Sequence, residues 1–199
     1  ETGFVEGRNV LVEYRWAENR YDHLPTLADD LVLRRVAVIV ANTPAALPAK
    51  AATKVIPIVF VTSLNPVETG LVLSLNRPGS NLTGVASLSV ELGPKRLQLL
   101  RELIPNANVV AALVNPSNPN AQIQLKDLEA AADTLGLQLH IVRARGEYDF
   151  DDAVGTLARL QPHALVVTED GLFNFWRENL PIAAERHRIP TIYPWREAV

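Results

Sequence analysis

Short runs of β-branched and other apolar residues alternate along this chain with longer stretches whose apolar residues recur at helical spacing. The runs predict strands at residues 10–14, 36–41, 58–62, 109–114, 138–142, 164–167 and 191–193, with an extended segment at 83–88. The stretches between them predict helices at residues 21–35, 43–53, 65–76, 94–103, 120–135, 150–160 and 172–187, the last interrupted by Pro181. Strands that alternate with helices form parallel sheets, so the pattern predicts an α/β fold.

The apolar run at residues 36–41 is continuous, which is typical of a strand buried on both faces. A turn-forming sequence at Pro78 and Gly79 divides the chain into two similar halves. We therefore expect two doubly wound lobes with mostly parallel sheets, each within the usual size of a domain. The first lobe is expected over 1–84, the second over 85–192, and the start of a crossover back to the first over 193–199.

The composition indicates a globular protein. Of the 199 residues, 48% are hydrophobic and 21% are charged, which excludes a disordered chain. The formal net charge is −3, so we expect no general attraction to nucleic acid or anionic lipid. No apolar run is long enough to span a bilayer. Because methionine is absent, we expect either a removed segment, such as a secretory signal, or an excised fragment.

Known catalytic motifs are missing from the sequence. Without cysteine, the chain has no disulfide, zinc–thiolate site, iron–sulfur cluster or cysteine nucleophile. Glycine-rich phosphate-binding motifs and the nucleophile elbow are missing, and the four histidines do not have metal-ligand spacing. We predict no catalytic residue, no metal and no cofactor, and an enzyme of doubly wound fold is the least favoured class.

Polar residues gather just after several predicted strands. In open α/β sheets ligands bind beyond the carboxyl ends of the strands, where helix N-termini present free N–H groups. Ordinary helix caps and turns are the alternative explanation for these residues, with Asn42 or Thr43 capping the helix at 43–53. The candidates are Asn42, Thr43, Thr62, Ser63, Asn115, Ser117, Asn118, Glu169 and Asp170.

Aromatic residues follow the last predicted strand, at Tyr193 and Trp195. A cleft lined by aromatic faces and a few amides is the usual build of a small-molecule site. Packing in the core is the alternative for each aromatic residue. The charged neighbour of Trp195 favours partial exposure of that side chain.

Several segments, taken in order, resemble one known family. They are Gly3-Phe4-Val5-Glu6-Gly7-Arg8-Asn9-Val10, Glu13-Tyr14-Arg15-Trp16-Ala17-Glu18, Thr43-Pro44-Ala45-Ala46, Pro57-Ile58-Val59-Phe60, Asn81-Leu82-Thr83-Gly84-Val85, Lys95-Arg96-Leu97-Gln98-Leu99-Leu100 and Val114-Asn115-Pro116-Ser117-Asn118-Pro119. Together they resemble the ABC-transporter substrate-binding proteins, a family that includes tryptophan- and tyrosine-uptake proteins.

The resemblance implies a type I periplasmic binding fold, in which two lobes joined by crossover strands close on a ligand. It implies that the first strand of the fold and the C-terminal segments are missing here, so that the first lobe is incomplete. The implied function is delivery of a small, aromatic or amino-acid-like ligand to an ABC permease, in the periplasm or from a lipid anchor. A ligand-sensing regulatory domain of the same fold is the alternative, and it would need a DNA-binding segment upstream.

The resemblance also suggests roles for the candidate residues. Asn42 and Thr43 match a loop that meets a ligand carboxylate, and Glu169 and Asp170 match a strand end where an acid pairs with a ligand amine. The remaining polar candidates match the loops that face each other between the lobes. The set suits a zwitterion with an aromatic side chain.

Overall fold

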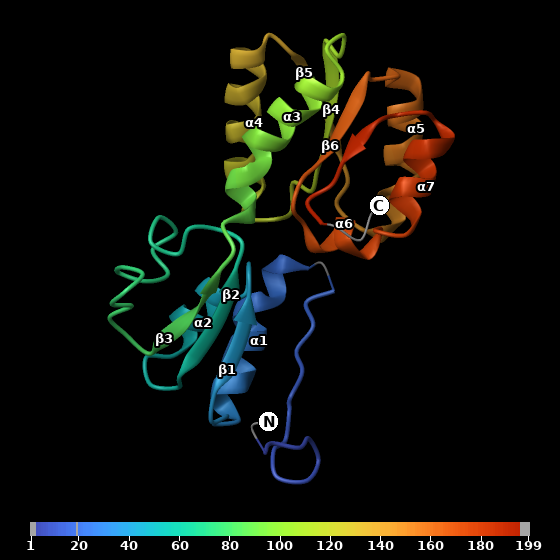
Figure 1. Ribbon diagram of the computed structural model, residues 1–199. Coiled ribbons are helices and arrows are strands. Elements are labelled where there is room, and N and C mark those ends of the chain that lie inside the picture. Colours follow the sequence, from blue (N-terminus) through green and yellow to red (C-terminus); the bar gives the residue numbers. More distant parts are fainter. Residues whose placement is uncertain (1–2, 19, 196–199) are drawn as a thin grey trace.

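The computed structural model describes residues 3–18 and 20–195 and shows two lobes, each built on its own parallel sheet (Figure 1). The three-stranded sheet of the first lobe has the order β1 (Ile39–Asn42), β2 (Ile58–Thr62), β3 (Leu82–Ala86). The four-stranded sheet of the second lobe has the order β5 (Gln138–Arg143), β4 (Val109–Val114), β6 (Ala164–Val167), β7 (Thr191–Ile192). The prediction of an α/β fold with two mostly parallel sheets is confirmed.

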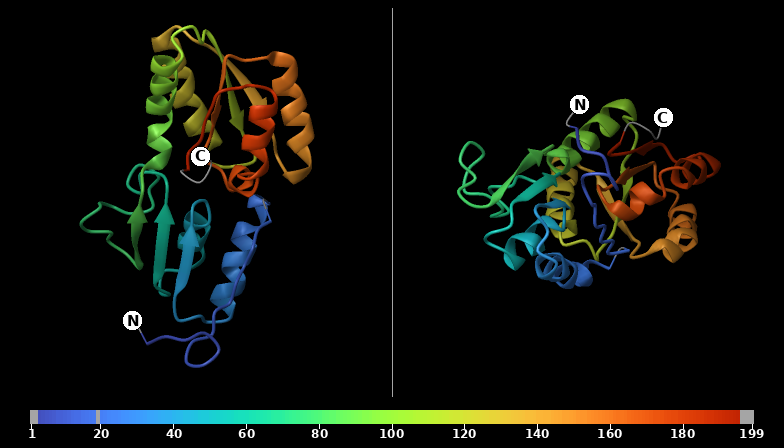
Figure 2. Two further views of the ribbon diagram at one scale, coloured as in Figure 1. Left: turned by 45° about the vertical axis from the view of Figure 1, so that its right-hand side comes forward. Right: turned by 90° about the horizontal axis from the view of Figure 1, so that it is seen from below.

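The second lobe has three layers, because helices cover both faces of its sheet (Figure 2). Side chains alternate along β4: Leu113 packs toward one face and Val110 toward the other. The first face is covered by α5 (Phe150–Leu160), α6 (Gly171–Phe175) and α7 (Asn179–Arg186). The second face is covered by α3 (Gly93–Leu103) and α4 (Ala121–Leu135).

In the first lobe, helices cover a single face of the sheet. Helices α1 (Leu24–Leu33) and α2 (Ala46–Ala52) pack on Ile39 and Phe60. On the opposite face Val40, Val61 and Val85 are 73%, 53% and 65% exposed. The prediction that residues 36–41 are buried on both faces is therefore wrong, because no described element covers the second face.

The chain passes from the first lobe to the second directly after β3. All five residues of β3 pair with β2, so we propose that the lobes divide after Ala86 and not at residue 84. A short turn and the 3-10 helix η2 (Ser89–Leu92) then lead into α3. Tyr193 and Trp195 pack against the core of the second lobe. The rest of the predicted second crossover, residues 196–199, lies outside the described residues.

Two predicted elements are absent. Residues 10–14 are extended but form no strand, and the nearby bridge joins only Glu6 and Val10. A strand needs a neighbouring strand to pair with, and beyond that single bridge this segment has none among the described residues. Residues 65–76 form turns instead of a helix, because Gly70 adopts a positive φ and ends the first turn that Asn65 begins.

Other helix boundaries also differ from the predictions. The 3-10 helix η1 (Tyr21–His23) precedes α1, and η3 (Glu147–Asp149) precedes α5. Helix α2 begins after Ala45, so neither Asn42 nor Thr43 caps it. The break between α6 and α7 precedes Pro181, which lies in the first turn of α7, where proline is tolerated.

Candidate functional site

Two loops of the second lobe meet where the strand order of its sheet reverses. From β4 the chain goes to β5 on one side, and then to β6 on the other side of β4. The loops after β4 and β6 therefore leave a crevice between them at the carboxyl edge, the usual ligand position in such sheets. Asn115 and Asn118 lie in the first loop, and Glu169 and Asp170 in the second.

Asp170 is a buried carboxylate that accepts hydrogen bonds on both oxygens. Oδ1 accepts from Nδ2 of Asn115 at 3.1 Å and from the backbone N of Leu172 at 2.7 Å. Oδ2 accepts from Nδ2 of Asn118 at 2.6 Å and from the Tyr21 hydroxyl at 3.4 Å. Asp170 is thus both the N-cap of α6 and the centre of the loop cluster.

Tyr21 reaches this cluster from η1, on the first-lobe side of the molecule. Burial raises the pKa of Tyr21, and the negative charge of Asp170 raises it further. The hydroxyl therefore stays protonated at physiological pH and acts as a donor. Its contact with Asp170 links the two lobes across the cleft.

Glu169, beside Asp170, is fixed through its backbone. The side-chain amide of Gln124, from α4, accepts from the Glu169 N at 2.8 Å and donates to the Glu169 O at 3.0 Å. Oε2 of Glu169 accepts from the Ser89 hydroxyl at 2.5 Å. The half-buried Arg96 lies near this carboxylate: burial lowers the pKa of Arg96, and the charge of Glu169 opposes that shift.

The facing loops of the first lobe are held together by hydroxyl groups. The Thr43 hydroxyl donates to Oγ1 of Thr62 at 2.8 Å and accepts from the Ser63 backbone N at 3.1 Å. Oγ1 of Thr62 in turn accepts from the Leu64 N at 3.2 Å. These bonds tie the ends of β1 and β2 into one polar edge.

A cleft of about 1720 Å³ lies between these loops and continues along the N-terminal segment. It is larger than the usual ~300–1,000 Å³ of a small-molecule site, because it joins an interlobe part to a groove beside β1. The predicted site residues that line it are Asn42, Thr43, Ser63, Asn118, Glu169, Asp170 and Trp195.

Four predicted site residues do not line this cleft. Thr62 and Asn115 are buried, with 4% and 1% exposed, and support the loops from behind. Ser117 is exposed outside the cleft, and Tyr193 packs on the second-lobe core beside Trp195.

The cleft also has lining residues that the sequence did not single out as site residues. Trp16, Tyr21 and Phe175 add aromatic surface, and Arg145 and Tyr148 line the second-lobe wall. Tyr21 and Tyr148 lie in the short 3-10 helices η1 and η3, Phe175 ends α6, and the positions of all five depend on the tertiary fold. The charged neighbour of Trp16 is the one local sign of exposure, and its side chain is 75% exposed.

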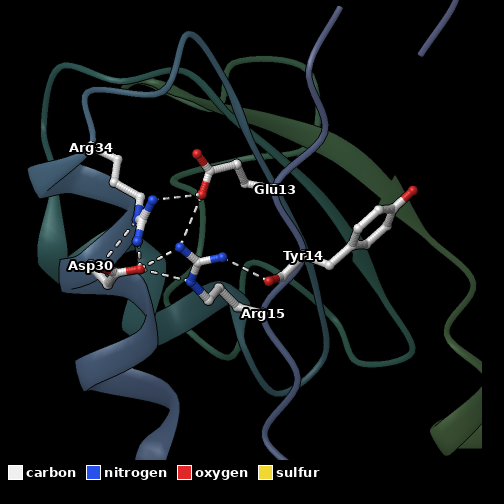
Figure 3. A network of polar contacts seen from close by, with 5 residues as sticks. All are labelled: Glu13, Tyr14, Arg15, Asp30 and Arg34. Atoms are coloured by element: carbon white, nitrogen blue, oxygen red, sulfur yellow. Dashed lines mark hydrogen bonds and ion pairs between the residues drawn. The ribbon is translucent and has the colours of Figure 1, made fainter. Parts of the chain in front are cut away.

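A charge cluster holds the N-terminal segment against α1 (Figure 3). Arg15 donates to Oδ2 of Asp30 through Nε at 2.7 Å and through Nη2 at 2.5 Å. Nη2 also lies 3.0 Å from Glu13, and Arg34 contacts both acids. The hydrogen bonds from Arg15 lower the pKa of Asp30, with a further contribution from Arg34.

Within residues 3–18 and 20–195, no group of three or more acidic or histidine side chains is arranged to hold a metal ion. Among the same residues, no helix has the length and apolar character needed to cross a bilayer.

A family model described as ABC transporter substrate binding protein matches residues 1–198. The chain belongs to this family. A tyrosine-binding protein of Clostridioides difficile (strain R20291) is 35% identical over 130 residues, which cover 64% of this chain and 37% of the relative. The chain thus spans little more than a third of that curated relative.

Solved structures support the fold of the chain. A conserved domain protein from Vibrio cholerae O1 biovar El Tor has a TM-score of 0.83 and 27% identity, over 98% of this chain and 66% of that chain. An ABC domain from Streptococcus pneumoniae in complex with L-Trp has a TM-score of 0.73 and 22% identity, over 89% and 61%. The type I periplasmic binding fold inferred from the sequence is confirmed.

Proposed function

We propose that the protein containing this chain captures a small, aromatic or amino-acid-like solute between its lobes and delivers it to an ABC permease. The observation that carries the proposal is the cleft, which polar strand ends line from both lobes. Family membership supports transport over regulation, and the tyrosine-binding relative supports the ligand class. We further propose that the protein binds without catalysis and acts in the periplasm or from a lipid anchor.

The chemistry of the cleft suits a zwitterion with a ring. Glu169 lines the cleft, and its Oε1 accepts no hydrogen bond from the described residues, so this oxygen is the acceptor we assign to a ligand ammonium. Asp170 is already surrounded by donors and positions the loops instead. Trp16, Phe175 and Trp195 offer aromatic faces to the side chain of the solute.

Thermal unfolding of the full-length protein with individual L-amino acids tests the proposal. A ligand that binds only the folded state stabilises it by RT ln(1 + [L]/Kd), or about 2.7 kcal/mol at one hundred times Kd. We expect L-tyrosine or a related aromatic compound to raise Tm in proportion to the logarithm of its concentration. No stabilisation by any aromatic or amino-acid ligand would contradict the proposed ligand class.

Two substitutions then locate the site. Glu169→Gln and Thr43→Ala should each weaken binding by about 1–3 kcal/mol, because partner groups would be left buried and unpaired. Glu185→Gln, at an exposed position of α7, is the matched control and should leave affinity unchanged. Unchanged affinity in both site variants, with the fold intact, would mean that the solute binds elsewhere.

A further inference from the structure

The segment that joins the lobes is hydrogen-bonded to the first lobe through its backbone. The Ser87 N donates to the carbonyl of Thr62 at 2.9 Å, and the Val90 N donates to the carbonyl of Ser63 at 3.2 Å. Both acceptors lie at the carboxyl end of β2, beside the cleft. These bonds attach the crossover to the first lobe, while η2 itself also packs against α3 and α4 of the second lobe.

Ser89, in the same segment, is attached to the second lobe through its side chain. A carboxylate only accepts hydrogen bonds, so the Ser89 hydroxyl donates to Oε2 of Glu169. The Ser89 oxygen is then free to accept from the Ser87 hydroxyl, which lies 3.0 Å away and has the Thr62 carbonyl, at 3.4 Å, as a second acceptor. The side chain of Gln124 bonds the backbone of Glu169. The carboxylate that accepts from Ser89 is therefore held in the second lobe.

The residue between these two attachments has an unusual conformation. Leu88 has φ 53° and ψ 24°, in the left-handed region that residues other than glycine rarely adopt. Such a conformation persists where the surrounding contacts over-determine it. The bonds of Ser87, Ser89 and Val90 are the contacts that hold Leu88 in place.

We propose that Ser89 is a positioning residue that couples the occupant of the cleft to the crossover between the lobes. This proposal rests on the proposed function in one respect, that the solute contacts Glu169. A cation at Oε1 takes up part of the negative charge that holds the Ser89 proton, and so weakens the attachment of the crossover to the second lobe. The lobes are then released to change their relative orientation around Leu88.

Distance measurements between spin labels on the two lobes test the coupling without a ligand. The sequence has no cysteine, so Val55→Cys and Leu103→Cys, at positions 85% and 79% exposed, provide one label on each lobe. Ser89→Ala and Glu169→Ala should each broaden the interlobe distance distribution, and the double variant should broaden it no further. Glu91→Ala is the matched control: Glu91 lies in the same 3-10 helix, is exposed, and its side chain makes no hydrogen bond or ion pair among the described residues, so the distribution should stay unchanged.

Two results would overturn the coupling, provided that circular dichroism shows each variant folded. One is an unchanged distribution in Ser89→Ala, and the other is equal broadening in Glu91→Ala. In the protein with Ser89 intact, L-tyrosine should shift the distribution, and in Ser89→Ala this shift should be lost. An equal shift in both would also overturn the coupling, whereas no shift in either, with the ligand-free differences present, would contradict the ligand assigned under the proposed function.

Discussion

At the scale of single residues, Asp170 shows that a cap and a site residue need not be alternatives. Its Oδ1 caps α6 through the Leu172 N, and the same carboxylate gathers Asn115 and Asn118 from the neighbouring loop. The sequence placed an acid at a strand end, which both explanations require. The second role depends on the reversal of strand order between β4 and β6, which residue types alone do not reveal.

Asp170→Asn should destabilise the second lobe. Whichever oxygen the amide nitrogen replaces, two donors lose their acceptor, at a cost of about 1–3 kcal/mol for each donor left buried and unpaired. Urea unfolding measures the change, and Asp133→Asn on the exposed face of α4 is the control. Equal stability of the two variants would show that the four contacts of Asp170 contribute little.

The Arg15–Asp30 pair predicts a pH dependence. The pKa of Asp30 is lowered in the folded protein, so below the ordinary aspartate pKa of about 3.9 the unfolded chain binds the proton first. The stabilisation is therefore complete at neutral pH and is lost as the pH falls through the folded pKa. The free energy of unfolding, measured from pH 7 down to pH 2, should therefore decrease less in Asp30→Asn than in the unaltered protein.

The neighbouring acid provides the control for that experiment. Asp29 is exposed, and its side chain makes no hydrogen bond or ion pair among the described residues. Asp29→Asn should lose as much free energy of unfolding between pH 7 and pH 2 as the unaltered protein does. If Asp30→Asn shows the same loss, the charge cluster does not contribute to stability.

At the scale of secondary-structure elements, hydrophobic periodicity predicted strands correctly where neighbouring strands pair with them and helices cover them. Strands β2, β4 and β6 are central in their sheets, and their apolar runs correspond to real strands. Residues 10–14 are also mostly apolar, but no strand pairs with them in the part of the chain that the structure describes, so they stay extended. The hydrophobic pattern reflects which side chains of a strand can be buried. It does not specify the neighbouring strand with which the backbone must pair.

Gly84 in β3 marks a close approach that a side chain would prevent. A β-carbon at this position would collide with the carbonyl oxygen and ring of Phe60 on β2. Gly84→Ala should therefore lower the free energy of unfolding by about 1–3 kcal/mol, as overpacking typically does. Gly146→Ala is the control, because a β-carbon there meets nothing within 4 Å, and equal stability of both variants would refute the close approach.

At the scale of the whole molecule, the two lobes differ in how completely their sheets are covered. Helices enclose both faces in the second lobe and one face in the first. The alternation of strands and helices predicted two similar lobes, because an apolar strand has the same pattern whether or not its second face is covered. Coverage depends on distant elements, and so it could not be inferred from the strands themselves.

The uncovered face predicts a measurable property of the 199-residue chain. Val40, Val61 and Val85 form an exposed apolar surface on adjacent strands, the kind of patch that binds hydrophobic dyes. Residues 1–199 should therefore increase bis-ANS fluorescence under native conditions. The double variant Val61→Thr/Val85→Thr should lower that signal while keeping the strands, because threonine is also β-branched. Ile182→Thr, at a 58% exposed position of α7, should not change the signal, and an equal decrease in both would place the dye site outside the sheet.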